Sequence, residues 1–238
     1  MKKVALLVLA VLLAAPIARA QETTITKFKD KPIHGLIVNG AFEVRLSQAE
    51  TSSARVEIFE ELQDKLIFEY TEEGFIRLDF KDDVTKYLTR SKKKPTAYIE
   101  VEQLRHCALT GACNLIAKGK FSTSGVFNMI NTGTAYMTWI NVECESASVD
   151  VTGSSKVDDI TVNARDKVVI NTAGTASAAV KVDCPTLTLT MAGTSKLTVS
   201  GKAENATYNV AGLSSLDLLG FDSPSLSGDV SRLGKVKK

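Results

Sequence analysis

A glycine followed by small or polar residues and then an apolar residue recurs at nearly constant spacing through the second half of the chain. The spacings between successive copies are 22, 20, 21, 19 and 19 residues. A repeat of this length, without helix-type periodicity, is typical of a solenoid in which each repeat forms one coil of β-strands. The glycines that mark the six copies are Gly111, Gly133, Gly153, Gly174, Gly193 and Gly212.

Aligning the copies on the glycine assigns a direction to each neighbouring position. The residues four and two positions before the glycine are mostly apolar and the residue between them is mostly polar, as in a strand with one buried face. The residue two positions after the glycine is always small, which suits the crowded inside of a corner. We therefore predict an all-β fold, a parallel β-solenoid with about 20 residues per coil. In it, Gly153, Gly174 and Gly193 should stack at one corner.

The chain before the repeat also alternates like β-strands, but without a regular period. This part is either a meander that caps the solenoid or its first coils with longer loops, and the sequence leaves both open. A charged stretch at 81–95, which includes Arg90 and Lys92 to Lys94, is typical of a solvated loop. The expected divisions are a signal peptide at 1–20, a strand-rich part at 21–103 and regular repeats at 104–238, with 21–238 forming one continuous domain.

The first twenty residues have the pattern of a secretory signal peptide. Two lysines precede an apolar stretch at 4–15, and Ala18-Arg19-Ala20 provides a small-residue cleavage site. The apolar stretch is shorter than the roughly 20 residues of a membrane-spanning helix. Because the first cysteine is Cys107, no cysteine follows the cleavage site to carry a lipid. We expect cleavage after Ala20 and an exported protein, periplasmic, at the outer surface or secreted, with neither a transmembrane segment nor a lipid anchor.

The charge balance of the chain argues against a nucleic-acid partner. The whole sequence has 29 basic and 27 acidic residues. Lys2, Lys3 and Arg19 belong to the predicted signal peptide, which leaves 26 basic residues against 27 acidic ones in the mature chain. A nearly neutral chain has no strong electrostatic attraction to nucleic acid or to an anionic membrane surface.

The positions of the four cysteines limit the disulfides that they could form. Cys107 and Cys113 flank one predicted corner and both point inward, so they either form a bridge or remain two buried thiols. Cys144 and Cys184 occupy equivalent positions two coils apart, a separation of about 9.6 Å. Because a disulfide requires Cα atoms roughly 4.4 to 6.8 Å apart, we expect these two cysteines to be free and buried.

The histidines do not form a recognisable catalytic or metal site. His106 is adjacent to Cys107, but neighbouring residues on a strand point to opposite faces, so we expect His106 to face solvent. His34 has no cysteine or carboxylate cluster near it in the sequence. We therefore assign no catalytic, cofactor-binding or metal-binding residue and expect no cofactor.

Two observations bear on carbohydrate chemistry. Polysaccharide-cleaving β-helix proteins hold calcium on stacked carboxylates, but the acidic residues of the repeats fall in different columns and provide no such cluster. These residues are Asp150, Asp158, Asp159, Asp166 and Asp183. Tyr136 and Trp139 lie in one coil and could belong to a sugar-stacking surface, although packing in the core is the more common fate of aromatic residues.

Several segments resemble the family described as "putative auto-transporter adhesin, head GIN domain". They are the glycine repeats, the strand-rich start at Val38–Val44 and the closing Leu226–Val230, followed by Gly234–Val236. The resemblance covers the chain from about residue 27 to its end. It implies an exported bacterial envelope protein with a right-handed parallel β-helix and no established enzymatic activity. The family usually has Gly-Ser-Gly at the corner, whereas this chain mostly has a single glycine followed by Ser, Thr or Ala.

The sequence thus leads to one principal functional hypothesis and two alternatives. We expect an exported, non-enzymatic β-solenoid of the cell envelope, either adhesin-like and binding an unknown ligand or structural. A carbohydrate-active β-helix, either a polysaccharide lyase or a glycosidase, is the first alternative. The second is a component of an envelope assembly that pairs through an exposed strand edge or an open end. The expected partner is a glycan or an envelope protein.

Overall fold

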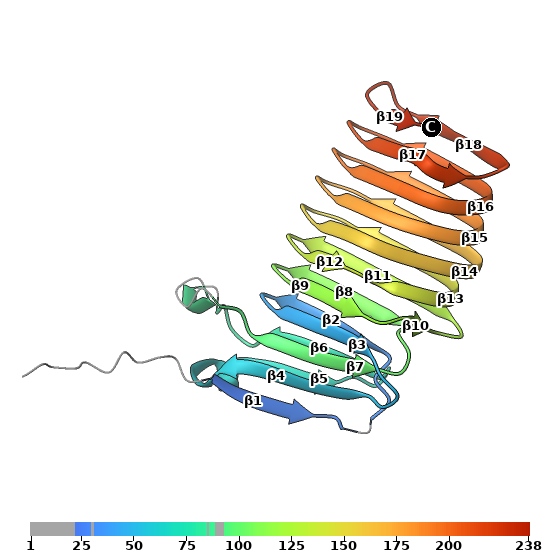
Figure 1. Cartoon of the computed structure of the whole chain (residues 1–238). Coiled ribbons are helices and arrows are strands. Elements are labelled where there is room, and N and C mark those ends of the chain that lie inside the picture. Colours follow the sequence, from blue (N-terminus) through green and yellow to red (C-terminus); the bar gives the residue numbers. More distant parts are fainter. Residues whose placement is uncertain (1–21, 30, 85, 89–92) are drawn as a thin grey trace, which may run out of the picture.

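The computed structural model describes residues 22–29, 31–84, 86–88 and 93–238 (Figure 1). The predicted signal peptide lies outside these residues. Within them, nineteen strands form one continuous curled sheet, and almost no helix is present. A β-solenoid of about seven turns covers residues 106–237. The all-β solenoid fold predicted from the repeat is therefore confirmed.

The regular coils stack in chain order, and every pairing between their strands is parallel. In each coil, one strand runs up to the repeat glycine and the next begins just after it. Longer strands continue around further corners. The strands of these coils are β8 (His106–Gly111), β9 (Asn114–Lys118), β10 (Phe121–Ser122), β11 (Val126–Gly133), β12 (Tyr136–Thr138), β13 (Asn141–Val151), β14 (Lys156–Thr172), β15 (Ser177–Met191), β16 (Lys196–Val210), β17 (Ser215–Asp222), β18 (Ser225–Val230) and β19 (Lys235–Lys237).

The repeat glycines form a continuous column at one corner, as predicted. A Cβ atom on Gly174 would lie 2.6 Å from the carbonyl oxygen of Gly153, and one on Gly193 would lie 2.7 Å from that of Gly174. These glycines also have positive φ angles, 80° at Gly174, which side chains rarely tolerate. The column begins one coil earlier than the sequence indicated, because a Cβ on Gly111 would meet the backbone of Gly40.

The inward columns are buried as the alternation predicted. All of the residues two and four positions before a repeat glycine are buried, and so are the small residues two positions after it. Three polar members of these columns bond to one another inside the corner. The hydroxyl of Thr172 donates to Ser195 Oγ at 3.0 Å, and Ser195 Oγ lies 3.1 Å from Ser214 Oγ. These three buried hydroxyls therefore find hydrogen-bond partners in the adjacent coils.

Four strands of the N-terminal part add two coils to the stack, but not in chain order. The inner coil consists of β2 (Gly35–Gly40) and β3 (Glu43–Gln48), which pair in parallel with β8 and β9. The outer coil consists of β6 (Phe75–Phe80) and β7 (Thr96–Val101), which pair with the opposite edges of β2 and β3. The first coil in the chain thus lies between two later ones (Figure 1).

Antiparallel strands complete the N-terminal end of the stack. β4 (Ser53–Phe59) pairs with β7, β1 (Glu22–Lys27) pairs with β4, and β5 (Leu66–Tyr70) pairs with β6. A 3-10 helix, η1 (Glu60–Lys65), connects β4 to β5. The N-terminal part therefore contains both solenoid coils and antiparallel strands that cap them, while the predicted domain boundaries stay a prediction.

The charged stretch at 81–95 is not simply a solvated loop. Residues 86–88 are helical, and the side chains of Val84 and Leu88 are each only 8% exposed and belong to the hydrophobic core. The prediction was wrong at these positions because charged residues dominate the composition of the stretch. The side chains of Val84 and Leu88 nevertheless pack against the hydrophobic core beside β6.

Candidate functional site

All four cysteines are free and buried, as predicted for Cys144 and Cys184. The bridge considered between Cys107 and Cys113 is not formed. Instead, the Cys113 thiol donates to the Gly40 carbonyl oxygen at 3.2 Å. The thiol thus has a hydrogen-bond partner inside the corner. Burial raises the pKa of Cys107 to about 12 and that of Cys113 to about 11. Neither thiol is poised to act as a nucleophile, since nucleophilic cysteines have lowered pKa values.

His106 does not face solvent freely. Its ring stacks on that of Phe75 with centroids 5.0 Å apart and an interplanar angle of 17°, and burial lowers its pKa. His106 points to the face opposite Cys107, as predicted, but its side chain is half-buried because Phe75 covers it. Phe75 lies on β6, which reaches this place only through the rearranged order of the N-terminal coils. Cys107 is fully buried on the opposite side of the strand, so the two residues share no site.

The acidic residues of the coils are dispersed, and several of them have partners of their own. Asp150 accepts hydrogen bonds from Asn171 Nδ2 at 2.8 Å and from Ser148 Oγ at 3.1 Å. Asp158 forms an ion pair with Lys156. Among the described residues, no group of three or more His, Cys, Asp or Glu side chains could hold a metal ion. The arrangement that calcium-dependent polysaccharide cleavage requires is therefore not found in this part of the chain.

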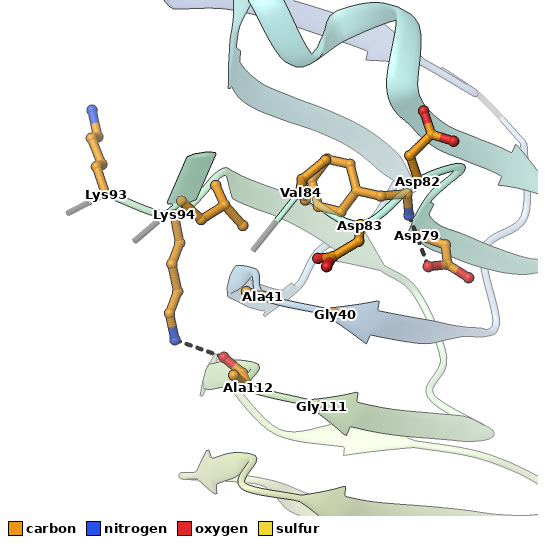
Figure 2. A pocket seen from close by; sticks show the side chains of 12 residues that line it. Gly40, Ala41, Asp79, Asp82, Asp83, Val84, Lys93, Lys94, Gly111 and Ala112 are labelled. Carbon is orange, nitrogen blue, oxygen red and sulfur yellow. Dashed lines mark hydrogen bonds between the residues drawn. The ribbon is translucent and has the colours of Figure 1, made fainter. Parts of the chain in front are cut away.

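A cavity of about 600 Å³ lies where the glycine corner meets the N-terminal coils (Figure 2). Its floor consists of the corner backbone of two stacked coils at Gly40, Ala41, Gly111 and Ala112. Its apolar wall consists of Phe80, Val84 and Leu88. The floor exists because the column of glycines leaves this corner without side chains.

Opposite charges lie on two sides of this cavity. Figure 2 shows Lys93 and Lys94 on one side and Asp79, Asp82 and Asp83 on the other. The Lys94 ammonium donates to the Ala112 carbonyl oxygen at 2.6 Å. The pocket thus combines an apolar centre with a cationic and an anionic margin, which suits an amphipathic ligand.

The walls of the cavity are held by aromatic stacking on the core, by a hydrogen bond and by an ion pair. The Phe80 ring stacks on that of buried Phe42 with centroids 4.8 Å apart. Asp79 accepts a hydrogen bond from Asn39 Nδ2 at 3.1 Å, and Asp82 lies 3.7 Å from Lys65 Nζ. Sequence reasoning missed this cavity because its floor and walls come from four separate segments, and only the glycines gave any signal.

Trp139 lies on the outside of the solenoid. Its side chain is 57% exposed, so the expectation of core packing was wrong for this residue. Tyr136 is half-buried, and its hydroxyl donates to Asp158 Oδ2 at 3.3 Å. The strand alternation breaks at Trp139 because this residue adopts a left-handed backbone conformation, with a φ angle of 63°.

The parallel coils define the class of protein to which this chain belongs, a β-solenoid. The chain belongs to the family described as "Putative auto-transporter adhesin, head GIN domain", whose model matches residues 33–237. Members of an adhesin family are expected to be exported or surface proteins. In the described part of the chain, no helix has the length and apolarity needed to cross a membrane. Among curated proteins, none matches this chain.

Several solved structures have the same fold. A putative adhesin from Bacteroides fragilis is 13% identical, with a TM-score of 0.71, and the match covers 91% of this chain and 96% of that one. A putative lipid binding protein from Parabacteroides distasonis is 14% identical, with a TM-score of 0.67 and coverage of 92% and 98%. A putative adhesin from Parabacteroides merdae is 15% identical, with a TM-score of 0.61 and coverage of 91% and 95%. At these identities the likeness establishes the fold alone.

Proposed function

We propose that this chain is an exported, non-enzymatic binding protein of the cell envelope that acts in an adhesin-like way. The observation that carries the proposal is the outer surface of the solenoid, where polar side chains from successive coils line up in columns. Thr132 Oγ1 and Thr152 Oγ1, for example, lie 3.1 Å apart on adjacent coils. Such a surface offers many hydrogen-bonding groups at regular intervals to an extended ligand. Family membership supports the same role.

Binding and catalysis can be separated in one experiment. The mature chain, residues 21–238, is added to a panel of immobilised glycans and envelope polymers, and both retention and release of soluble sugar are measured. We expect saturable retention without sugar release. Release of product would support the carbohydrate-active alternative, and no retention on any member of the panel would contradict the binding role.

A second candidate function follows from the mixed character of the N-terminal cavity. We propose that it accepts an amphipathic ligand whose carboxylate faces Lys94 and whose apolar part covers Phe80. The putative lipid binding protein of the same fold makes this chemistry worth testing. The described lining of the cavity is apolar at its centre and charged only at its margins, as such a ligand requires.

The cavity hypothesis can be tested with a fluorescent fatty acid as the probe. Ala41→Trp should fill the cavity from its floor and weaken binding at least 10-fold, since Ala41 lines the site. Ala173→Trp is the control, because Ala173 is half-buried like Ala41 but lies next to a column glycine in a coil remote from the cavity. Equal binding by the wild type and Ala41→Trp would contradict the hypothesis.

A further inference from the structure

The exposed aromatic residue Trp139 occupies a strained position that the core does not explain. Among the described residues, only Phe28, Trp139 and Asp159 have positive φ angles without being glycine. Such angles are uncommon for bulky side chains and often mark functional sites. The flanking residues Thr138 and Ile140 are buried, so the left-handed backbone turns the indole of Trp139 outward between two inward side chains.

Trp139 and Asp159 are neighbours in adjacent coils. Thr138 pairs with Asp158 and Asn141 pairs with Thr161, and this constant register places Trp139 opposite Asp159. The backbone N–H of Trp139 donates to the Asp158 carbonyl oxygen at 3.4 Å. The two strained residues therefore form one local feature that extends over two coils.

A shallow groove of about 290 Å³ continues from this feature along the solenoid. Its outward-facing lining comes from β14, β15 and β16, three successive coils. Thr161, Lys181 and Ser200 form one outward column, since each is paired with the next across the sheet. The second column consists of Asp159, Ala179 and Thr198. The groove thus runs parallel to the long axis of the stack. Trp139 lies in the coil that precedes the coil of Asp159.

The chemistry of this surface favours a carbohydrate. An exposed indole offers an apolar face on which a sugar ring can stack, and the groove beside it supplies hydroxyls, a carboxylate and an ammonium group for sugar hydroxyls. The small side chain of Ala179 leaves room between the polar groups. Asp159 and Lys181 balance each other in charge, so the groove lacks the positive excess that nucleic acid requires.

We propose that this groove binds a neutral glycan chain that runs along the solenoid axis and stacks one ring on Trp139. The proposal rests on the binding role proposed above and specifies its ligand class and site. It requires no metal ion and no chemical step. A glycan in this position contacts the outer side chains of four coils, from the Trp139 coil to the Ser200 coil.

Trp139 is the only tryptophan of the chain, so its fluorescence reports directly on the site. The probes are soluble hexasaccharides of β-1,4-linked glucose and of β-1,4-linked N-acetylglucosamine. We expect a saturable change in emission with at least one of them. By calorimetry, Trp139→Ala should weaken binding at least 10-fold, whereas Trp139→Phe should retain part of the affinity. Thr198→Arg, which blocks the groove away from the indole, should also weaken it.

The matched control is Leu219→Ala, which removes a comparably exposed apolar side chain from β17 and should leave affinity unchanged. Circular dichroism verifies that each variant is folded. Binding that is unaffected by both Trp139→Ala and Thr198→Arg would overturn this site while leaving the general binding role intact. Failure of both hexasaccharides to bind also overturns the proposal. Only the additional failure of the immobilised panel would remove the proposed function as well.

Discussion

Replacing Gly174 by alanine tests whether the backbone geometry of the corner requires a glycine at this position. The new Cβ atom would lie 2.6 Å from the Gly153 carbonyl oxygen, far inside ordinary contact. The same oxygen accepts the Thr175 N–H at 2.7 Å, so relieving the clash disturbs that hydrogen bond. Gly174 also has a φ angle of 80°, which an alanine adopts only with strain.

The expected loss of stability follows from these contributions. The left-handed backbone costs alanine about 1–2 kcal/mol, and a weakened hydrogen bond costs about 0.5–1.5 kcal/mol. With the backbone displacement added, we expect Gly174→Ala to lower the free energy of unfolding by about 2–4 kcal/mol. For a chain of this size, that corresponds to a decrease in Tm of about 4–16 °C.

Two further glycines separate the contributions. Gly40 has a positive φ of 94°, but a Cβ there would lie 3.7 Å from Phe80 Cδ2, which is ordinary contact. Gly40→Ala should therefore cost only the strain, about 1–2 kcal/mol. A Cβ on Gly125 would meet nothing within 4 Å, so Gly125→Ala should stay within about 0.5 kcal/mol of the wild type. Urea unfolding followed by circular dichroism measures all three, and equal stability of the Gly174 and Gly125 variants would refute the argument.

The remaining predictions concern the interior of the corner and the thiols. Ser195→Ala should lower the free energy of unfolding by about 1–3 kcal/mol in urea, because it leaves the buried hydroxyls of Thr172 and Ser214 without their shared partner; Thr194→Ala, at an exposed position, is its control. Iodoacetamide at pH 8 should modify Cys113 about 100-fold more slowly in the folded chain than in urea, because burial raises the pKa of Cys113 from 9.0 to about 11. Mass spectrometry checks this, and rapid native labelling would contradict it. The raised pKa also implies a stability contribution that is complete below pH 9 and lost as the pH rises toward about 11, which unfolding at several alkaline pH values measures.

The regular coils were predictable from sequence because each contact in them repeats at one period. A residue two positions before a glycine meets its counterpart about twenty residues away, so a single alignment fixes burial, direction and stacking together. The small side chains of Ser155 and Ser195 were informative for the same reason, since the corner admits nothing larger. These inferences needed only the alternation of strands and the volume of side chains.

The N-terminal coils were less predictable because their neighbours are distant in sequence. Gly40 belongs to the column, but Phe42 stands two residues after it where every other copy has a small residue. The reason is visible only in the fold, where Phe42 stacks on Phe80 from a coil that follows it in the chain. The expectation of core packing for Trp139 was wrong for a different reason. The general preference of aromatic residues for the core does not predict where the backbone adopts a left-handed conformation.

The position of the β2–β3 coil between two later ones has a kinetic consequence. From β8 onward, each coil can fold onto the previous one by closing a loop of about twenty residues. The β2–β3 coil instead serves as a template on both of its edges. Its pairing with β8 requires that β4 to β7, which lie between them in the sequence, first take positions elsewhere. We therefore expect the C-terminal coils to add and detach stepwise, so that whole repeats could be deleted there, whereas the β2–β3 coil is the seed without which neither direction of growth can start.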